Sequence, residues 1–314
     1  MDRTEFSIYG KLIQDKRNIS LESIEKDYVL SRVLSSYQTL KTQETQLQEI
    51  IFKGGTLLAK KYLKYHRISV DLDFTHKDSN KIRVLRGKTR ETKIKKLIIP
   101  LIEAFSKIAK QCGFDFQTNR TNARYVSILN DRSVYKLYMY YTSLINANEE
   151  VIKIEINFIE DQIFKLSEDK LLNLAEFLGV EKKRLNVINY DLLEVTIPHY
   201  NIQEVMLEKI RAILTRNALK ERDVLDLYLL DKIYPLNKLS TLFIKRKVVS
   251  AEGFLQRVDK HLLKSIKLLQ EQPEHFLKSD DNIELLLLKD INKKKYHKFK
   301  KDLLPFLIRI IKDI

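Results

Sequence analysis

Two aspartates separated by a single residue form the part of this sequence best suited to chemistry. Asp71 and Asp73 lie near the end of the stretch 53–74, which reads KGGTLLAKKYLKYHRISVDLDF. In an extended chain, side chains two residues apart point the same way, and their Cα atoms lie about 6.6 Å apart at ~3.3 Å per residue. Carboxylates so placed can converge on divalent cations, the arrangement used for nucleotidyl transfer. The pair is therefore a candidate site for divalent cations, Mg²⁺ or Mn²⁺.

The residues around the two aspartates predict a strand over 67–74 with one buried and one polar face. Its apolar residues alternate with the polar series Arg67, Ser69, Asp71 and Asp73. Alternation of this kind is typical of a half-buried strand. One face is thus expected to present a cation, a hydroxyl and two carboxylates.

A pair of glycines precedes this strand. Gly54 and Gly55 predict a turn, and the residues from Thr56 to about 63 predict a short helix. Glycine lets backbone approach a ligand closely, and the free N–H groups at a helix start favour an anion such as a triphosphate. An isolated Asp-x-Asp is often just a solvated face. The order of turn, helix and polar strand favours a nucleotide site instead.

A third carboxylate is predicted on a later strand, over 151–158. Glu155 lies between Lys153 and Asn157 on its polar face. It could act as a metal ligand or as a base for an attacking hydroxyl, provided that its strand lies beside residues 68–74.

Composition limits the class of protein. The chain has 314 residues, one cysteine (Cys112), a net charge of +15 and a pI of about 9.5. No apolar run approaches ~20 residues and the N-terminus lacks an apolar signal region, so we expect a cytoplasmic protein without membrane segments. The positive charge indicates a polyanionic partner such as RNA, although a genome bias towards lysine would give the same composition. The basic segment 77–96, expected as a loop, is either a surface for phosphates or a solvated face.

The periodicity of the chain predicts an α+β fold. Helices are expected over 19–37 and 94–111, and strands over 50–52, 125–129, 134–141 and 151–158. From about residue 169 the pattern is helical, with a possible strand over 192–197. We therefore expect a mixed-sheet core over 1–165 and a mostly helical lobe over 166–314, with a soft boundary near 165–200.

Two helices of the second half carry acidic residues among leucines. They are expected over 204–216, with Lys209, and over 221–233, with Asp223 and Asp226. Unpaired buried charge is costly, so these aspartates need partners. One hypothesis is a structural salt bridge to Lys209 or Arg211. The other is that Lys209 contacts a triphosphate and an aspartate orients it.

The motifs Gly54-Gly55-Thr56, Arg67-x-Ser69-x-Asp71-Leu72-Asp73-Phe74, Lys153-x-Glu155 and Lys209…Arg222-Asp223-x-x-Asp226-Leu227 resemble the AbiEii/AbiGii-type nucleotidyltransferase toxins. The segment 25–31 resembles the leading helix of that family, which lies in the polymerase-β-like superfamily and is related to the MenT toxins. The resemblance covers roughly residues 19–233. It implies a bi-lobed protein with an N-terminal nucleotidyltransferase core and a helical C-terminal lobe.

The resemblance also implies a function and roles for residues. Related toxins of toxin–antitoxin and abortive-infection (phage defence) systems move a nucleotide from an NTP to the 3′ end of tRNA, and a cognate antitoxin accompanies them. By resemblance, Asp71 and Asp73 hold Mg²⁺, and Gly54, Gly55 and Ser69 contact the phosphates. Lys209 positions the triphosphate, and Asp223 or Asp226 completes the catalytic set. Arg67 pairs with a carboxylate or a phosphate.

Two other functions remain open at this point. The same site could transfer a nucleotide to a protein or act as a kinase, but a protein acceptor needs less positive surface. Alternatively, the chain is a non-catalytic nucleic-acid-binding scaffold. Decay of an enzyme usually removes a metal carboxylate, and both Asp71 and Asp73 are present.

Overall fold

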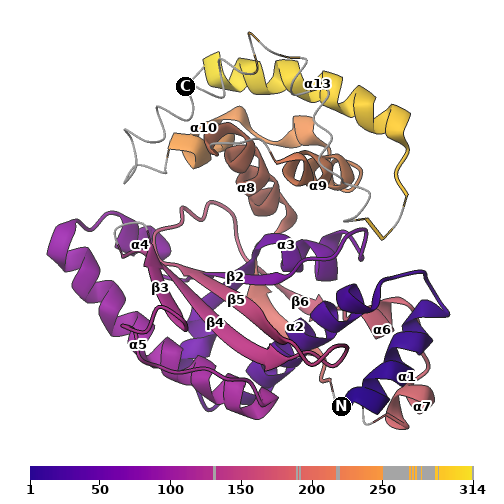
Figure 1. Cartoon of the computed structure of the whole chain (residues 1–314). Coiled ribbons are helices and arrows are strands. Elements are labelled where there is room, and N and C mark those ends of the chain that lie inside the picture. Colours follow the sequence, from indigo (N-terminus) through magenta and orange to yellow (C-terminus); the bar gives the residue numbers. More distant parts are fainter. Residues whose placement is uncertain are drawn as a thin grey trace. The chain divides into compact units, whose positions relative to one another are not determined.

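The computed structural model describes residues 1–129, 132–188, 190, 192–216, 220–249 and 290–312, with single positions at 269, 271, 273, 277, 287 and 288 (Figure 1). The chain forms two compact units. The first contains Met1–Glu160 and Leu166–His199, and the second contains Asp161–Lys165 and Tyr200–Ile314. Each unit is described separately below.

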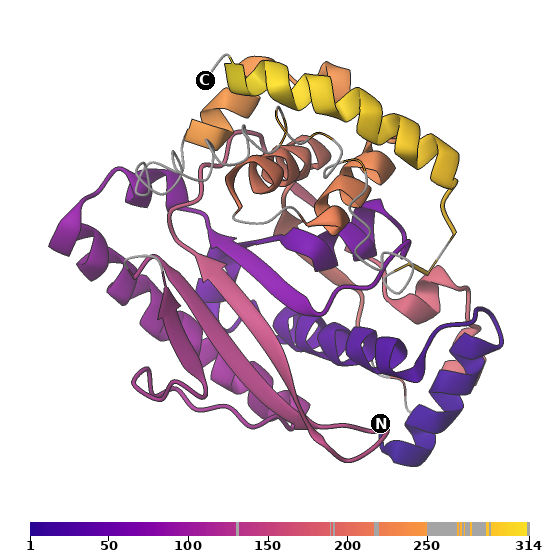
Figure 2. The same cartoon turned by 45° about the horizontal axis from the view of Figure 1, so that its top comes forward.

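A mixed seven-stranded sheet organises the first unit, as both views of the cartoon show (Figures 1 and 2). The spatial order is β3-β4-β5-β2-β1-β7-β6, with β2–β5 and β1–β7 parallel and the other pairs antiparallel. The strands are β1 (Ile50–Lys53), β2 (Asp71–His76), β3 (Val126–Leu129), β4 (Val134–Thr142), β5 (Glu149–Asn157), β6 (Ser167–Leu171) and β7 (Val195–His199). This mixed sheet with helices around it confirms the α+β prediction.

Two long helices supply the apolar cover of this sheet. They are α2 (Leu21–Leu40), which Ser20 caps at its first turn, and α5 (Gly87–Cys112), which ends at the left-handed Gly113. Phe105 of α5 meets Phe74 of β2 with ring centroids 6.0 Å apart. By the strand register, Phe52 and Ile156 share this buried face with Phe74. Side chains alternate along a strand, so the residues before and after each of these point to the opposite face, which carries the polar side chains.

The remaining helices of the first unit are short, apart from α1 (Arg3–Gln14). They are η1 (Thr45–Glu49), α3 (Gly54–Leu57), η2 (Leu58–Tyr62), α4 (Ser79–Arg83), α6 (Leu174–Phe177) and α7 (Lys182–Asn186). The glycine pair does open a helix, as predicted, and η2 continues α3 with π-helical geometry.

The second unit is helical where it is described. It contains α8 (Ile202–Thr215), α9 (Glu221–Asp231), η3 (Leu236–Lys238), α10 (Thr241–Val249) and α13 (Lys293–Lys312). Helix α8 packs against α9 and α10, and α13 packs against α9 and α10. Within the described ranges, no helix combines the length and the apolar character needed to cross a membrane.

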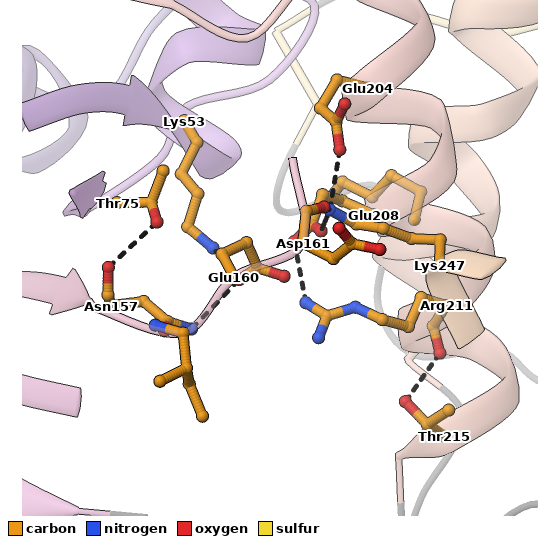
Figure 3. Close-up of polar contacts among 12 residues, drawn as sticks. Lys53, Thr75, Asn157, Glu160, Asp161, Glu204, Glu208, Arg211, Thr215 and Lys247 are labelled. Carbon is orange, nitrogen blue, oxygen red and sulfur yellow. Dashed lines mark hydrogen bonds and ion pairs between the residues drawn. The ribbon is translucent and has the colours of Figure 1, made fainter. Parts of the chain in front are cut away.

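The chain passes from the first unit to the second at the peptide bond between Glu160 and Asp161 (Figure 3). In the first unit, Glu160 accepts hydrogen bonds from Lys53 Nζ at 2.8 Å and Asn157 Nδ2 at 3.0 Å. In the second unit, Arg246 donates two hydrogen bonds to the Asp161 carboxylate, at 3.0 and 2.9 Å. Consecutive residues are thus each fixed within their own unit.

A fully buried lysine holds the helical unit together near this crossing. Lys247 Nζ lies 2.7 Å from Glu204 Oε1 and 2.6 Å from Glu208 Oε1, as Figure 3 shows. Glu204 Oε2 in turn accepts hydrogen bonds from the backbone N–H groups of Ile163 and Phe164, at 2.8 Å each. These contacts attach the segment Asp161–Lys165 to α8 and α10.

Several sequence-based boundaries were wrong. The strand expected over 67–74 begins at Asp71, and Val70 is 51% exposed rather than buried. The basic segment 77–96 is mostly helical, because α4 occupies part of it and α5 starts at Gly87. The first unit extends past residue 165 as far as His199, inside the soft boundary expected near 165–200, since β6 and β7 form the other edge of its sheet. β6 was missed because most of its residues are polar and exposed, as befits an edge strand.

A buried ion pair connects helix α2 to η2, the segment that follows the glycine turn. Lys60 Nζ donates to Asp27 Oδ1 at 2.6 Å, to Ser31 Oγ at 2.8 Å and to Tyr65 Oη at 2.9 Å. Asp27 also accepts a hydrogen bond from the Leu174 N–H at 3.2 Å. All three lysine protons therefore have acceptors, the condition under which a buried charge is tolerated.

This ion pair gives a test of stability. Asp27→Ala should lower the free energy of unfolding by about 3–5 kcal/mol, because it leaves the buried Lys60 without its counter-charge. The matched control is Lys26→Ala, which breaks the partly exposed Lys26–Glu150 pair and should cost ~1 kcal/mol or less. Urea denaturation would measure both. Equal losses would contradict the assigned role of Asp27.

Candidate active site

Two carboxylates lie directly opposite each other on neighbouring parallel strands. Asp73 of β2 is the register partner of Glu155 of β5, and Asp71 is the partner of Lys153. Adjacent strands are about 4.8 Å apart, so the negative charges of Asp73 and Glu155 face each other at short range. Like charges in this position destabilise a sheet. The condition set for Glu155, that its strand lie beside the aspartates, is therefore met.

Burial and the neighbouring negative charge make the Asp73 carboxyl a weaker acid than an ordinary aspartate. Burial, and then the negative charge of Glu155, raise the pKa of Asp73 to about 6, from an ordinary value of 3.8. Lys53, its register partner on β1, opposes the shift without cancelling it. A carboxylate so destabilised in its charged form is poised to accept a cation.

Lysines already hold the neighbouring carboxylates. Lys153 Nζ lies 2.6 Å from Asp71 Oδ2, and Lys136 Nζ of β4 lies 3.6 Å from Glu155 Oε2. In the part of the chain that the structure describes, no three acidic, histidine or cysteine side chains already converge as metal ligands. The donor set nevertheless suits a divalent cation: carboxylate oxygens are the ligands of Mg²⁺, and the charges of Asp73 and Glu155 are incompletely balanced.

The glycine turn packs directly against the carboxylate strand. Gly54 has φ +79°, in the left-handed region, and a Cβ there would overlap Asp73 Oδ2. A Cβ on Gly55 would come within 2.7 Å of Ser69 Oγ and 3.1 Å of Arg67 Nη2. Thr56 Oγ1 donates a hydrogen bond to the Asp71 carbonyl. The residues predicted to bind the nucleotide in this unit therefore lie next to one another, with the turn against the segment that leads into β2.

Arg67 and Ser69 precede the strand rather than lying in it. Arg67 is 5% exposed, and its Nη1 donates to the Ile68 carbonyl at 3.1 Å. It was expected on an open strand face, but here it supports the backbone that leads into Asp71. Ser69 remains partly exposed beside Gly55.

The other three candidates belong to the helical unit. Lys209 Nζ lies 2.9 Å from Asp223 Oδ1 and 2.6 Å from Asp226 Oδ2, and Arg216 also pairs with Asp223. Asp223 and Asp226 are buried. These contacts are those of the structural salt bridge that we considered, with Lys209 as partner. They leave the triphosphate role of Lys209 a prediction.

Sequence reasoning missed three charged residues around the carboxylates. Lys53 is the register partner of Asp73, Lys136 that of Glu155, and Glu160 is the ion-pair partner of Lys53. Lys53 was detectable in principle, because it immediately precedes Gly54. The other two become relevant only through the pairing of β4 with β5 and the path of the chain after β5.

The shifted acidity of Asp73 gives a test with a defined sign. The folded-state pKa of about 6 exceeds the ordinary value of 3.8, so charged Asp73 costs stability once the pH rises above about 4, and fully above about 6. Asp73→Asn should therefore raise the melting temperature in EDTA at pH 7.5 by about 2 °C or more, as ~1 kcal/mol would do. The gain should vanish near pH 4.

Calorimetry from pH 4 to 8 would measure this gain. Glu103→Gln, at an exposed position on α5, is the control and should show no such pH-dependent gain. A destabilised Asp73→Asn protein at pH 7.5 would show that Asp73 is held by favourable contacts instead.

Comparisons with known proteins identify a matching family and similar solved structures. Residues 38–310 match the family described as "Nucleotidyl transferase AbiEii toxin, Type IV TA system". MenT4, a nucleotidyltransferase toxin from Mycobacterium tuberculosis, is similar with 17% identity and a TM-score of 0.54, over 100% of this chain and 90% of that one. JHP933 from Helicobacter pylori is similar with 13% identity and a TM-score of 0.45, over 94% and 96%. No curated protein matches the sequence.

At 17% identity the MenT4 structure supports the fold alone, whereas the family match spans most of the chain. The glycine turn, the Asp71–Asp73 strand and Glu155 all lie within the matched residues. The chain therefore belongs to the AbiEii family of toxins from type IV toxin–antitoxin systems, and it is a nucleotidyltransferase.

Proposed function

We propose that this nucleotidyltransferase transfers NMP from an NTP to the 3′ end of an RNA, with tRNA as the expected acceptor and Mg²⁺ or Mn²⁺ as the metal. The observation that carries the proposal is the in-register opposition of Asp73 and Glu155, with Asp71 two residues away on the same face. Three carboxylates on one sheet face suit a reaction in which charge must be balanced at a phosphate.

We assign Asp71 and Asp73 to hold the metal, and Glu155 to serve either as a third ligand or as a base. When bound, a divalent cation would neutralise negative charge on the phosphates of the NTP and on the departing pyrophosphate. In the transfer, the attacking hydroxyl oxygen bonds to the α-phosphorus, and the bond from that phosphorus to pyrophosphate breaks. The hydroxyl proton passes to a base, for which Glu155 is our candidate.

In our proposal, the other site residues of the first unit orient the nucleotide. Gly54 and Gly55 let the turn pack closely against Asp73 and Ser69, because a Cβ at either position would collide with those side chains. In our proposal the backbone of this turn contacts the phosphates. Ser69 supplies a hydroxyl beside Gly55, while Thr56 and Arg67 fix the backbone on either side of the site. In the second unit, Lys209 would bind the triphosphate and Asp223 or Asp226 would orient that lysine.

Charge supports RNA as the acceptor. The net charge of +15 favours a polyanion over a typical protein substrate. An NTP and an RNA are both available in the bacterial cytoplasm, where we propose that the enzyme acts. Membership of a type IV toxin–antitoxin family implies a cognate antitoxin as a further partner.

A transfer assay tests the proposal. Purified protein with each of four α-³²P-labelled NTPs, total tRNA and Mg²⁺ should label tRNA with a preferred nucleotide. Asp71→Ala and Asp73→Ala should reduce labelling at least ~10³-fold while the protein stays folded, because the site loses a charged ligand. Glu103→Gln should label like the wild type.

The outcomes separate the acceptors. Label on protein in a cell lysate, without label on RNA, would replace the RNA acceptor by a protein. Labelling that persists in both aspartate variants would refute the metal-site assignment. The same variants should lose toxicity at matched expression.

The role of Lys209 is tested separately. Lys209→Gln should raise the KM for NTP at least about tenfold, the usual loss when a charged phosphate contact is removed. Arg216→Gln is the control, because it also removes a cation from Asp223. If both variants lower the melting temperature and neither changes the KM for NTP, then Lys209 is a structural salt bridge.

A further inference from the structure

A row of cations and aromatic rings extends from the carboxylates along the polar face of the sheet. On β4, Lys136, Tyr138 and Tyr140 alternate with the buried Leu137 and Met139. Lys136 is the register partner of Glu155, and Tyr138 is the partner of Lys153, which itself pairs with Asp71. Strand pairing therefore places this row next to the carboxylates. We call Lys136, Tyr138, Tyr140, Lys153 and Arg124 the lysine–tyrosine stripe.

Arg124 continues the stripe at its far end. Its guanidinium carbon lies 3.8 Å from the centre of the Tyr140 ring, and Tyr140 Oη donates to the Arg124 carbonyl at 3.0 Å. Arg124 also pairs with Glu149 at 2.8 Å and Asp115 at 3.5 Å, which hold the guanidinium against the ring. Nearer the carboxylates, Tyr138 Oη lies 3.2 Å from Ser127 Oγ of β3. Hydrogen bonds thus orient both rings.

The stripe is accessible on this face. The side chains of Lys136, Lys153 and Arg124 are 24%, 30% and 41% exposed, and both tyrosines are half-buried. Its residues lie on β4 and β5, except for Arg124, which precedes β3; these three strands lie side by side in both views, with β3 at the edge of the sheet (Figures 1 and 2). Helix α5 covers the other face.

We propose that the lysine–tyrosine stripe binds the unpaired 3′ end of the RNA acceptor and directs its terminal hydroxyl to the carboxylates. Aromatic and guanidinium planes that stack bases, interleaved with cations that contact phosphates, are how proteins bind single-stranded nucleic acid. Tyr138 offers one such plane and the Arg124–Tyr140 stack offers another. A blunt duplex has its bases already stacked and paired, so it gains nothing from these planes. This inference rests on the proposed function and adds a preference for unpaired RNA.

A binding experiment without NTP tests the stripe apart from catalysis. The probe is a 5′-fluorescein RNA hairpin with an unpaired 3′ tail, and the comparison probe is the same hairpin with a blunt end. Fluorescence anisotropy with Mg²⁺ gives Kd for each. The tailed hairpin should bind the wild type more tightly than the blunt one.

Paired substitutions identify the stacking. Tyr138→Leu should weaken binding of the tailed hairpin about tenfold or more, the loss expected for one base–aromatic stack. Tyr138→Phe keeps the ring, loses only the contact with Ser127, and should bind nearly as the wild type does. Both variants should bind Mg·NTP with unchanged Kd. In the transfer assay, Tyr138→Leu should raise the KM for RNA, whereas Tyr138→Phe should leave it nearly unchanged.

A charge variant supplies a second, independent measurement. Lys136→Gln should reduce the slope of log Kd against log salt by about one, because it removes one phosphate contact. Lys107→Gln is the control. Lys107 lies on α5, pairs with Glu44, and should leave the slope unchanged.

The outcomes are distinguishable. If the wild type labels RNA but Tyr138→Leu binds the tailed hairpin normally, the stripe is refuted and the proposed function stands. If Tyr138→Leu instead weakens NTP binding alone, the ring serves the nucleotide and the inference is refuted. If the wild type neither binds nor labels RNA, the proposed function itself fails and the stripe fails with it.

Discussion

Repulsion between Asp73 and Glu155 is the constraint on which the rest of the site depends. Parallel pairing of β2 and β5 places the two carboxylates in register, and partial burial deprives them of the water that would screen them. A fold selected for stability alone would place a neutral or cationic residue at one of these positions. We take the two opposed acids as support for our proposal that this face binds a divalent cation.

The surrounding structure limits what this repulsion costs. Lys153 pairs with Asp71, Lys136 lies 3.6 Å from Glu155, and Lys53 stands beside Asp73 while paired with Glu160. Gly54 gives Asp73 room that no other residue would leave, since its own φ is positive and a Cβ would collide with the carboxylate. The apolar layer of α2 and α5 keeps β2 and β5 fixed from behind. The polar face can therefore be strained without loss of the fold.

The helical unit uses charge in another way. Two of its buried cations, Lys247 and Lys209, each have two carboxylate partners. Glu204 also accepts a hydrogen bond from the segment that follows Glu160. In these networks the buried cations are paired with carboxylates, the condition under which buried charge is tolerated. The opposed pair at Asp73 and Glu155 is the contrasting case, because its balance is incomplete. That contrast is why we centre the chemistry on the sheet.

The sequence by itself determined the polar and apolar faces of the strands, the glycine turn, the helix behind it and the α+β class. These follow from local periodicity and from the special geometry of glycine. It also identified Asp71, Asp73 and Glu155 as acids on strand faces. Only the tertiary structure decided that Glu155 stands opposite Asp73, that Lys53 and Lys136 flank them, that Arg67 is buried, and that β6 and β7 extend the sheet. Local patterning decides which face of a strand a residue occupies, but which strand lies beside it is decided by pairing between residues distant in the chain.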